Sequence, residues 1–170
     1  GQPRLLGFDL ATNLPVHQYD FPSNVAGFLS MLNDFQVDPA GEHVYIAEAS
    51  PILRRPAIIV YDVRTDTSRR LLDRDRSVSP RDYILNGAGR DIVVLGIYSV
   101  RIGIDSITLD DRGAWLYYGP VNGDRLWRVA TRDLNDTSLS PAALSGRVQD
   151  YAPKPLSDGA QVQVYGQVSV

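Results

Sequence analysis

A strand-hairpin pattern occurs three times in this chain, and its repetition constrains the fold more than any other feature. In each copy a polar residue begins a short β-type run, a turn with a glycine follows, and a second β-type run comes next. The turn glycines are Gly41, Gly113 and Gly166. When they are aligned, the polar residues that begin the first runs form one column, which consists of Asn33, Asp105 and Asp158. A unit that recurs in this way predicts an array of similar modules.

The chain opens with two strands and a complete four-strand unit. The β-type runs over residues 4–10 and 15–21 flank a polar turn, which predicts a hairpin. Four further runs follow one another over residues 33–73. The turn over residues 38–41 has a proline that fixes one φ and a glycine that accepts a positive one, which indicates a tight connection between the first two strands.

A second four-strand unit and the start of a third unit come later in the chain. Residues 77–90 are polar and contain proline and glycine, which predicts a long loop, followed by an extra strand over residues 91–96. The second unit covers residues 105–151 and includes a short helix over residues 140–144, capped by a serine and opened by a proline. The third unit, residues 158–170, has two strands.

Repeated four-stranded antiparallel units predict an all-β protein of the β-propeller type. The chain supplies twelve such strands, about three blades' worth, in a single partial domain over residues 1–170. In a propeller the innermost strand of each blade lines the central channel. The polar column of Asn33, Asp105 and Asp158 would therefore meet at one mouth of this channel.

Composition excludes several classes of protein. Hydrophobic residues make up 44% of the 170 residues, which is typical of a globular chain. The formal charge is −3, and the densest basic stretch, residues 69–76, is interleaved with aspartates. We therefore expect a solvated loop there and no nucleic-acid partner. No apolar run approaches the roughly 20 residues that span a bilayer, so no membrane partner is expected. The absence of cysteine excludes disulfides and thiol nucleophiles, and it leaves the compartment open, including a secreted or periplasmic one if a leader was removed.

The polar column is the main candidate for a functional site. Three side-chain oxygens at one channel mouth suit a hard cation such as Ca²⁺, and they also suit a small polar molecule. A structural alternative stays open, because Asp and Asn before a strand often bond to the backbone of adjoining loops. We expect the two histidines to be structural, His17 on an exposed or edge strand and His43 after the Gly41 turn.

Several segments resemble the Yellow / major royal jelly protein family, particularly its bacterial members. Among them are Leu32-Asn33-Asp34-Phe35-Gln36-Val37-Asp38 and Lys154-Pro155-Leu156-Ser157-Asp158-Gly159. The others are residues 3–10, 44–49, 59–63, 103–107, 116–120 and 126–129. The resemblance runs along nearly the full length and implies a six-bladed β-propeller, distantly related to the gluconolactonase / regucalcin lactonases. The chain departs from the family pattern in offering only half of such a propeller.

The resemblance also implies roles for the column residues. In the lactonase relatives a metal is held by a Glu of an early blade, by an Asn at the head of one inner strand and by the Asp of an Asp-Gly pair at another. Asn33 and Asp158 match the last two, whereas the Glu has no counterpart here. Asn33 and Asp158 are thus expected metal ligands for Ca²⁺ or another divalent cation. Asp105 is expected to supply a further oxygen at the channel mouth.

Three functions follow from these expectations. The first is a scaffold of the Yellow / royal jelly type that binds a small molecule or an ion at the channel mouth. The second is a metal-dependent lactonase-type hydrolase with Asp105 as the candidate catalytic base. The third is an assembly module without a ligand of its own.

A half-ring leaves strand edges and core surface exposed, which favours association. Three origins are open: the chain is a fragment of a longer protein, further chain is missing from this sequence, or the chain is a half that pairs with itself. In the last case a head-to-tail homodimer would complete a six-bladed propeller. The two C-terminal strands of one copy would then finish the blade begun by the two N-terminal strands of the other.

Overall fold

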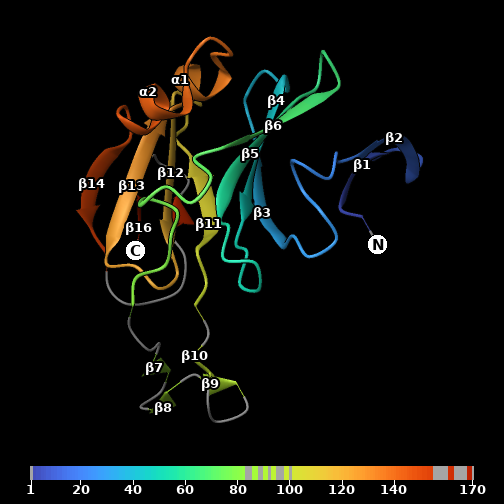
Figure 1. Ribbon diagram of the computed structural model, residues 1–170. Coiled ribbons are helices and arrows are strands. Elements are labelled where there is room, and N and C mark those ends of the chain that lie inside the picture. The colour runs from blue at the N-terminus through green and yellow to red at the C-terminus, as the bar shows by residue number, and fades with distance from the viewer. Residues whose placement is uncertain are drawn as a thin grey trace.

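The computed structural model describes residues 2–82, 86–87, 90–91, 93–94, 98–99, 101–154, 161–162 and 168–169. Within them the chain forms antiparallel sheets and two short helices (Figure 1). The all-β prediction is confirmed. No described helix has the length and apolarity needed to cross a membrane.

Two four-stranded sheets have the order expected of propeller blades, in which each strand pairs with the next one along the chain. The first blade consists of β3 (Leu32–Val37), β4 (His43–Glu48), β5 (Ala57–Asp62) and β6 (Thr67–Leu71). The second consists of β11 (Ile104–Leu109), β12 (Trp115–Pro120), β13 (Arg125–Ala130) and β14 (Gln149–Pro153). Short turns join most neighbouring strands, so each blade is a simple meander.

The remaining sheets have two strands each. The N-terminal hairpin pairs β1 (Arg4–Asp9) with β2 (Leu14–Asp20), as predicted. In the third unit, β15 (Gln161–Val162) pairs with β16 (Val168–Ser169). A loop and one extra strand were expected over residues 77–96. Instead, this stretch contains three of the four strands that form two short β-strand pairs. These are β7 (Asn86–Gly87) with β8 (Arg90–Asp91), and β9 (Val93–Val94) with β10 (Tyr98–Ser99).

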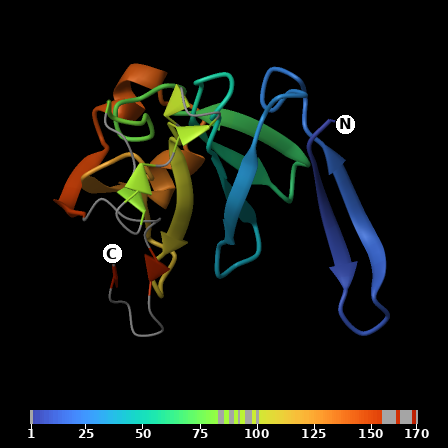
Figure 2. The same ribbon diagram turned by 90° about the horizontal axis from the view of Figure 1, so that it is seen from below.

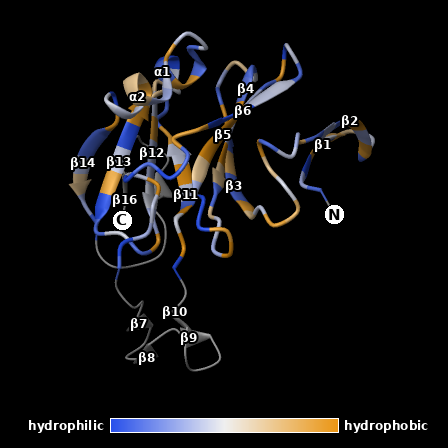
Figure 3. Cartoon of the chain, viewed as in Figure 1, coloured by the Kyte–Doolittle hydropathy of each residue, from blue (hydrophilic) through white to orange (hydrophobic). Residues whose placement is uncertain are grey.

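The hairpin, the first blade and the second blade lie side by side as three successive layers (Figure 2). This arrangement explains the nearly continuous apolar sequence of β4 and β5, because both faces of the first blade are covered. Tyr45 and Ala47 face the second blade in the larger core, whereas Val44 and Ile46 face the N-terminal hairpin in the smaller one. The hydrophobic colouring of β5 in Figure 3 reflects this double burial.

The same alternation organises the second blade. Leu116 and Tyr118 of β12 belong to the core shared with the first blade. Trp115 and Tyr117 lie on the opposite face with Leu126. These aromatic residues pack between or over sheets, as a strand period of two predicts.

The turns after β3 and β11 occupy equivalent places in neighbouring blades. Gly41 and Gly113 have φ values of 70° and 65°, the left-handed region in which glycine is favoured. A Cβ atom on Gly113 would overlap the ring of Pro39, which belongs to the turn of the first blade. The two blades therefore approach each other closely where the turn glycine of one meets the turn proline of the other.

Two helices lie between β13 and β14. The predicted helix is α2 (Pro141–Ser145), and Ser140 Oγ accepts a hydrogen bond from the Ala143 amide at 3.2 Å, as a cap should. The other, α1 (Thr131–Asn135), was not expected as a separate element. The last strand of the blade, β14, ends at Pro153, two residues beyond the predicted end of the unit at residue 151, because α2 and the turn after it extend to residue 147.

Candidate functional site

The heads of β3 and β11 lie next to each other, because these innermost strands are neighbours across the two blades. Asn33 Nδ2 donates a hydrogen bond to the backbone carbonyl oxygen of Asp105 at 3.3 Å. The Asn33 side chain is exposed, whereas Asp105 is partly buried. Two of the three residues of the polar column are thus brought together, one through its side chain and one through its backbone.

Asp34 makes the second link between the two strand heads. Its Oδ2 accepts a hydrogen bond from the Ile107 amide at 3.2 Å, and its Oδ1 accepts one from the Phe35 amide at 2.9 Å. The structural role that carboxylates often have before a strand is therefore filled by Asp34. The sequence analysis did not select Asp34 as a candidate. The signal was the Asn-Asp pair at the strand head, in which one side chain can contact the neighbouring blade and the other can face the channel.

Asp158 lies outside the described residues. Among the residues that are described, no group of three or more His, Asp or Glu side chains is close enough to hold a metal ion. The metal ligands Asn33 and Asp158, and the candidate base Asp105, accordingly stay predictions.

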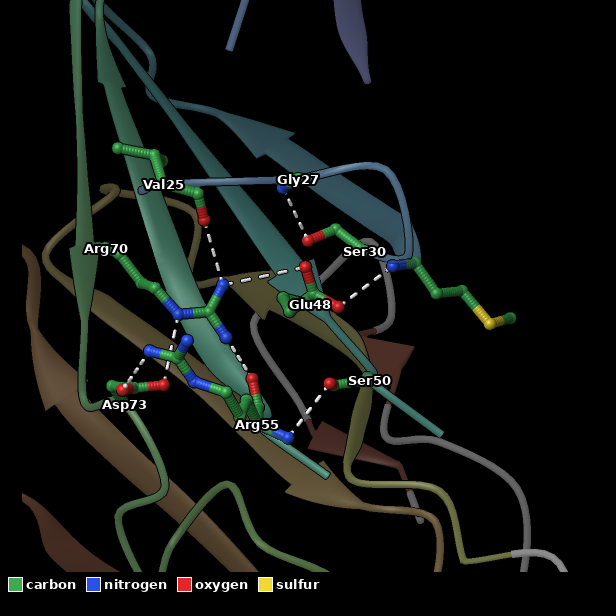
Figure 4. A network of polar contacts seen from close by, with 9 residues as sticks. Val25, Gly27, Ser30, Glu48, Ser50, Arg55, Arg70 and Asp73 are labelled. Carbon is green, nitrogen blue, oxygen red and sulfur yellow. Dashed lines mark hydrogen bonds and ion pairs between the residues drawn. The ribbon is translucent and has the colours of Figure 1, made fainter. Parts of the chain in front are cut away.

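A buried ion pair holds the segment that leads into β3 (Figure 4). Glu48, at the end of β4, has a side chain that is 1% exposed. Its Oε1 accepts a hydrogen bond from the Met31 amide at 2.9 Å, and its Oε2 lies 3.6 Å from Arg70 Nη1. Because Met31 lies two residues before Asn33, Glu48 anchors the backbone that places Asn33 at the strand head.

Arg70 connects this carboxylate to the loop before β3 and to the chain after β6. Its Nη1 donates to the Val25 carbonyl at 2.9 Å, and its Nε donates to Asp73 Oδ1 at 3.1 Å (Figure 4). Burial opposes ionisation of Asp73, but hydrogen bonds from Arg55 and Arg70 outweigh it and lower the pKa of that carboxyl. The prediction that this basic stretch is solvated is wrong for Arg70, whose side chain is 11% exposed.

A cavity of about 370 Å³ opens beside the turn between β12 and β13. This turn lies at the same end of the second blade as the head of β11, because Ile104 pairs with Pro120. The guanidinium of Arg76 stacks 5.1 Å from the ring centre of Trp127, and Arg81 forms an ion pair with Asp124 at 2.7 Å. The lining therefore combines charged side chains with apolar surface from two prolines and Trp127.

The sequence model of the major royal jelly protein family matches residues 1–162. The chain belongs to the major royal jelly protein family. The match spans the N-terminal hairpin and both complete blades, so the expected family and its propeller-type fold are confirmed for the strands described above.

The chain of this major royal jelly family protein is also similar to a solved structure. No curated protein sequence matches the chain. Hydrazine synthase of Kuenenia stuttgartiensis is similar in structure, with a TM-score of 0.49 and 14% sequence identity. The match covers 82% of this chain and 36% of that chain, so the present sequence spans about a third of its structural neighbour.

Neither histidine of this major royal jelly family chain lies at the strand heads. His17 is on β2, has a side chain that is 42% exposed, and bonds to the Tyr61 hydroxyl at 2.7 Å. It is exposed on an edge strand, as predicted. His43 begins β4 at the other end of the first blade, where its Nδ1 bonds to Asp38 Oδ2 at 3.0 Å.

Proposed function

We propose that this major royal jelly family chain is a scaffold that binds a small molecule or an ion at the channel mouth, with Asn33, Asp105 and Asp158 as the binding residues. The observation that supports this function is the pairing of two inner-strand heads, with Asn33 bonded to the backbone of Asp105. The buried Glu48–Arg70 pair adds support, because it fixes the segment before Asn33 and so reduces the ordering cost of binding.

The chemistry of these residues favours a hard cation among the ions. The contact with Asp105 uses the amide nitrogen of Asn33, and the amide oxygen is the atom that a cation would use. Amide and carboxylate oxygens are the ligands that Ca²⁺ takes. In the lactonase form of the proposal, Asn33 and Asp158 would hold a cation that would supply polarisation of the lactone carbonyl, and Asp105 would accept a proton from the attacking water.

Thermal unfolding in Ca²⁺ and in chelator tests the ion-binding function. A cation that binds only the folded chain raises stability by about 2.7 kcal/mol at a hundredfold excess over Kd. We expect this gain in the unaltered chain and in Asp111→Ala, a control in the turn at the opposite end of β11, and its loss in Asn33→Ala and Asp158→Ala. Unchanged stability of the unaltered chain in Ca²⁺ and in chelator would contradict ion binding.

Hydrolysis of a sugar lactone, measured in the same samples, separates binding from catalysis. Turnover that chelator abolishes and that Asp105→Asn lowers would support the hydrolase. Stabilisation by Ca²⁺ without turnover would support the plain scaffold.

A second candidate function, self-assembly, is favoured by the surface of the N-terminal hairpin. Leu6, Phe8, Leu14 and Val16 are exposed on β1 and β2, with Val16 at 67%. An apolar strand surface of this kind favours association. We propose that a second copy covers it head to tail, with β15 and β16 of that copy completing the sheet that β1 and β2 begin.

Light scattering of the purified chain measures this assembly directly. A mass of twice the 18.8 kDa of one chain is expected. The substitution Phe8→Lys should return the mass to that of one chain. The control Ile52→Lys alters a more exposed apolar residue outside the hairpin and should leave the dimer intact. A monomer at every concentration examined would overturn the assembly function.

A further inference from the structure

A cavity of about 260 Å³ lies at the end of the first blade opposite to Asn33. It is bounded by strands β4, β5 and β6 and by the end of α1. His43, which lines it, pairs with Asp62 at one end of β4, whereas Leu32, next to Asn33, pairs with Glu48 at the other end. Six strand residues span about 20 Å. The cavity is therefore a separate site from the strand heads.

The His43 imidazole is held in one orientation. Its Nδ1 lies 3.0 Å from Asp38 Oδ2, and the two side chains are 18% and 13% exposed. Asp38 is fixed in turn, because its Oδ1 accepts a hydrogen bond from the Glu42 amide at 2.7 Å. The ring stacks on Tyr45, with 19° between the planes. Since a carboxylate only accepts, Nδ1 carries a proton, and in the tautomer that holds this single proton Nε2 is an acceptor.

The opposite wall of the cavity comes from the second blade. Asn135, the last residue of α1, bonds through its amide to the Tyr45 hydroxyl at 3.0 Å. Arg69 of β6 donates to the Leu134 carbonyl at 2.6 Å, which fixes α1 against the first blade. These contacts hold the two walls together, so the cavity is formed before any ligand enters.

The lining combines hydrogen-bond donors and acceptors with balanced charge. Hydroxyls come from Thr65, Thr67 and Thr137. Asp62 supplies a carboxylate, and Arg69 supplies a guanidinium of opposite sign. A hydroxyl group can donate and accept at once, so a ligand with several hydroxyls matches this mixture better than a purely anionic or cationic one. The volume is just below the range of about 300–1,000 Å³ that small-molecule sites usually occupy.

We propose that this cavity binds a neutral, polyhydroxylated molecule about the size of a monosaccharide, with His43 Nε2 accepting a hydrogen bond from a ligand hydroxyl. Asp38 and Tyr45 are positioning residues that hold the imidazole. The site is independent of the channel mouth, and its ligand needs neither Asn33 nor a metal.

Nuclear magnetic resonance of the imidazole nitrogens tests the proposal, because the chain has two histidines and His17 serves as the internal reference. Glucose, galactose and mannitol are the probes, and methylammonium chloride is the charged comparison. We expect at least one of the three polyols to shift the His43 Nε2 signal saturably, with a Kd in the millimolar range, while the His17 signals stay unchanged.

Two variants and one control make the outcome decisive. His43→Gln and Thr137→Ala should each weaken polyol binding at least tenfold, as followed on the Asn135 side-chain amide signal. His17→Gln, which changes the other histidine, should bind as the unaltered chain does. Thr137 is exposed in the loop after α1, so Thr137→Ala tests the site even if His43→Gln fails to fold.

Three results would overturn the proposal. The first is the absence of a saturable His43 shift with all three polyols. The second is an equal shift at both histidines, which would indicate a general solvent effect. The third is a shift with methylammonium but not with polyols, which would assign the cavity to a cation.

Discussion

Gly113 meets two requirements that a residue with a side chain cannot meet together. Its φ of 65° lies in the left-handed region, and a Cβ atom there would overlap the Pro39 ring of the neighbouring blade. The first requirement was visible in the sequence as a turn glycine. The second arises only when the two blades are packed together.

The substitution Gly113→Ala should therefore lower the free energy of unfolding by more than the cost of left-handed backbone alone, which is about 1–2 kcal/mol. Chemical denaturation measures the change. Gly146→Ala is the matched control, because Gly146 has a φ of −65° and a Cβ atom would meet ordinary contacts there. The control should stay within about 0.5 kcal/mol of the unaltered chain. A loss at Gly113 no larger than the backbone cost of about 1–2 kcal/mol would show that the contact with Pro39 carries no energy.

Asn33 and Asp34 show how neighbouring residues of one strand head have different tasks. Asp34 bonds to the Ile107 amide and so ties β3 to β11. Asn33 is exposed and bonds to the blade next to it through its amide nitrogen. The sequence pattern indicated this strand head. It could not show which of the two side chains makes which contact, because the contacts depend on how β11 is aligned beside β3.

At the scale of single elements, β4 and β6 are joined by more than their pairing with β5. Glu48 and Arg70 place opposite charges in the interior at the same end of the blade, and together they hold the loop before β3. Such a pair depends on both members, because an unpaired buried charge is costly.

Removal of the Arg70 charge alone should consequently destabilise the folded chain strongly. We expect Arg70→Met to lower the free energy of unfolding by about 3–5 kcal/mol, because the Glu48 carboxylate stays buried without its partner. The double variant Glu48→Leu/Arg70→Met removes both charges and should recover most of this loss. Arg64→Met, at an exposed turn position, is the control and should have little effect. A double variant as unstable as Arg70→Met would contradict the ion pair as the cause.

Elements with an internal signal were predictable, whereas those made by tertiary contacts were not. The strands of the blades follow from apolar runs and turn residues, and α2 follows from Ser140 and Pro141. The helix α1 has no side-chain cap of its own, and it is held instead by the hydrogen bond from Arg69 to the Leu134 carbonyl. Local sequence therefore gave no sign of it.

At the scale of the whole molecule, the family and the propeller-type fold could be predicted because the repeat and the segment order extend along the chain. The burial of Arg70 could not, since a basic stretch in sequence does not show which arginine faces a buried Glu. The cavity beside His43 was also beyond prediction. Its walls come from β4 and α1. Tyr45 and Asn135, which join these walls, are 90 residues apart in the sequence.

The close approach of Gly113 to Pro39 has a consequence for ring geometry. Neighbouring blades form a wedge, and the angle of each wedge decides how many blades close a circle. A side chain at position 113 would separate the two turns at one end of the sheets and leave the strand heads of β3 and β11 bonded at the other. Each blade would then be tilted relative to its neighbour along the channel axis. The same tilt between every pair of blades would turn a closed ring into a spiral.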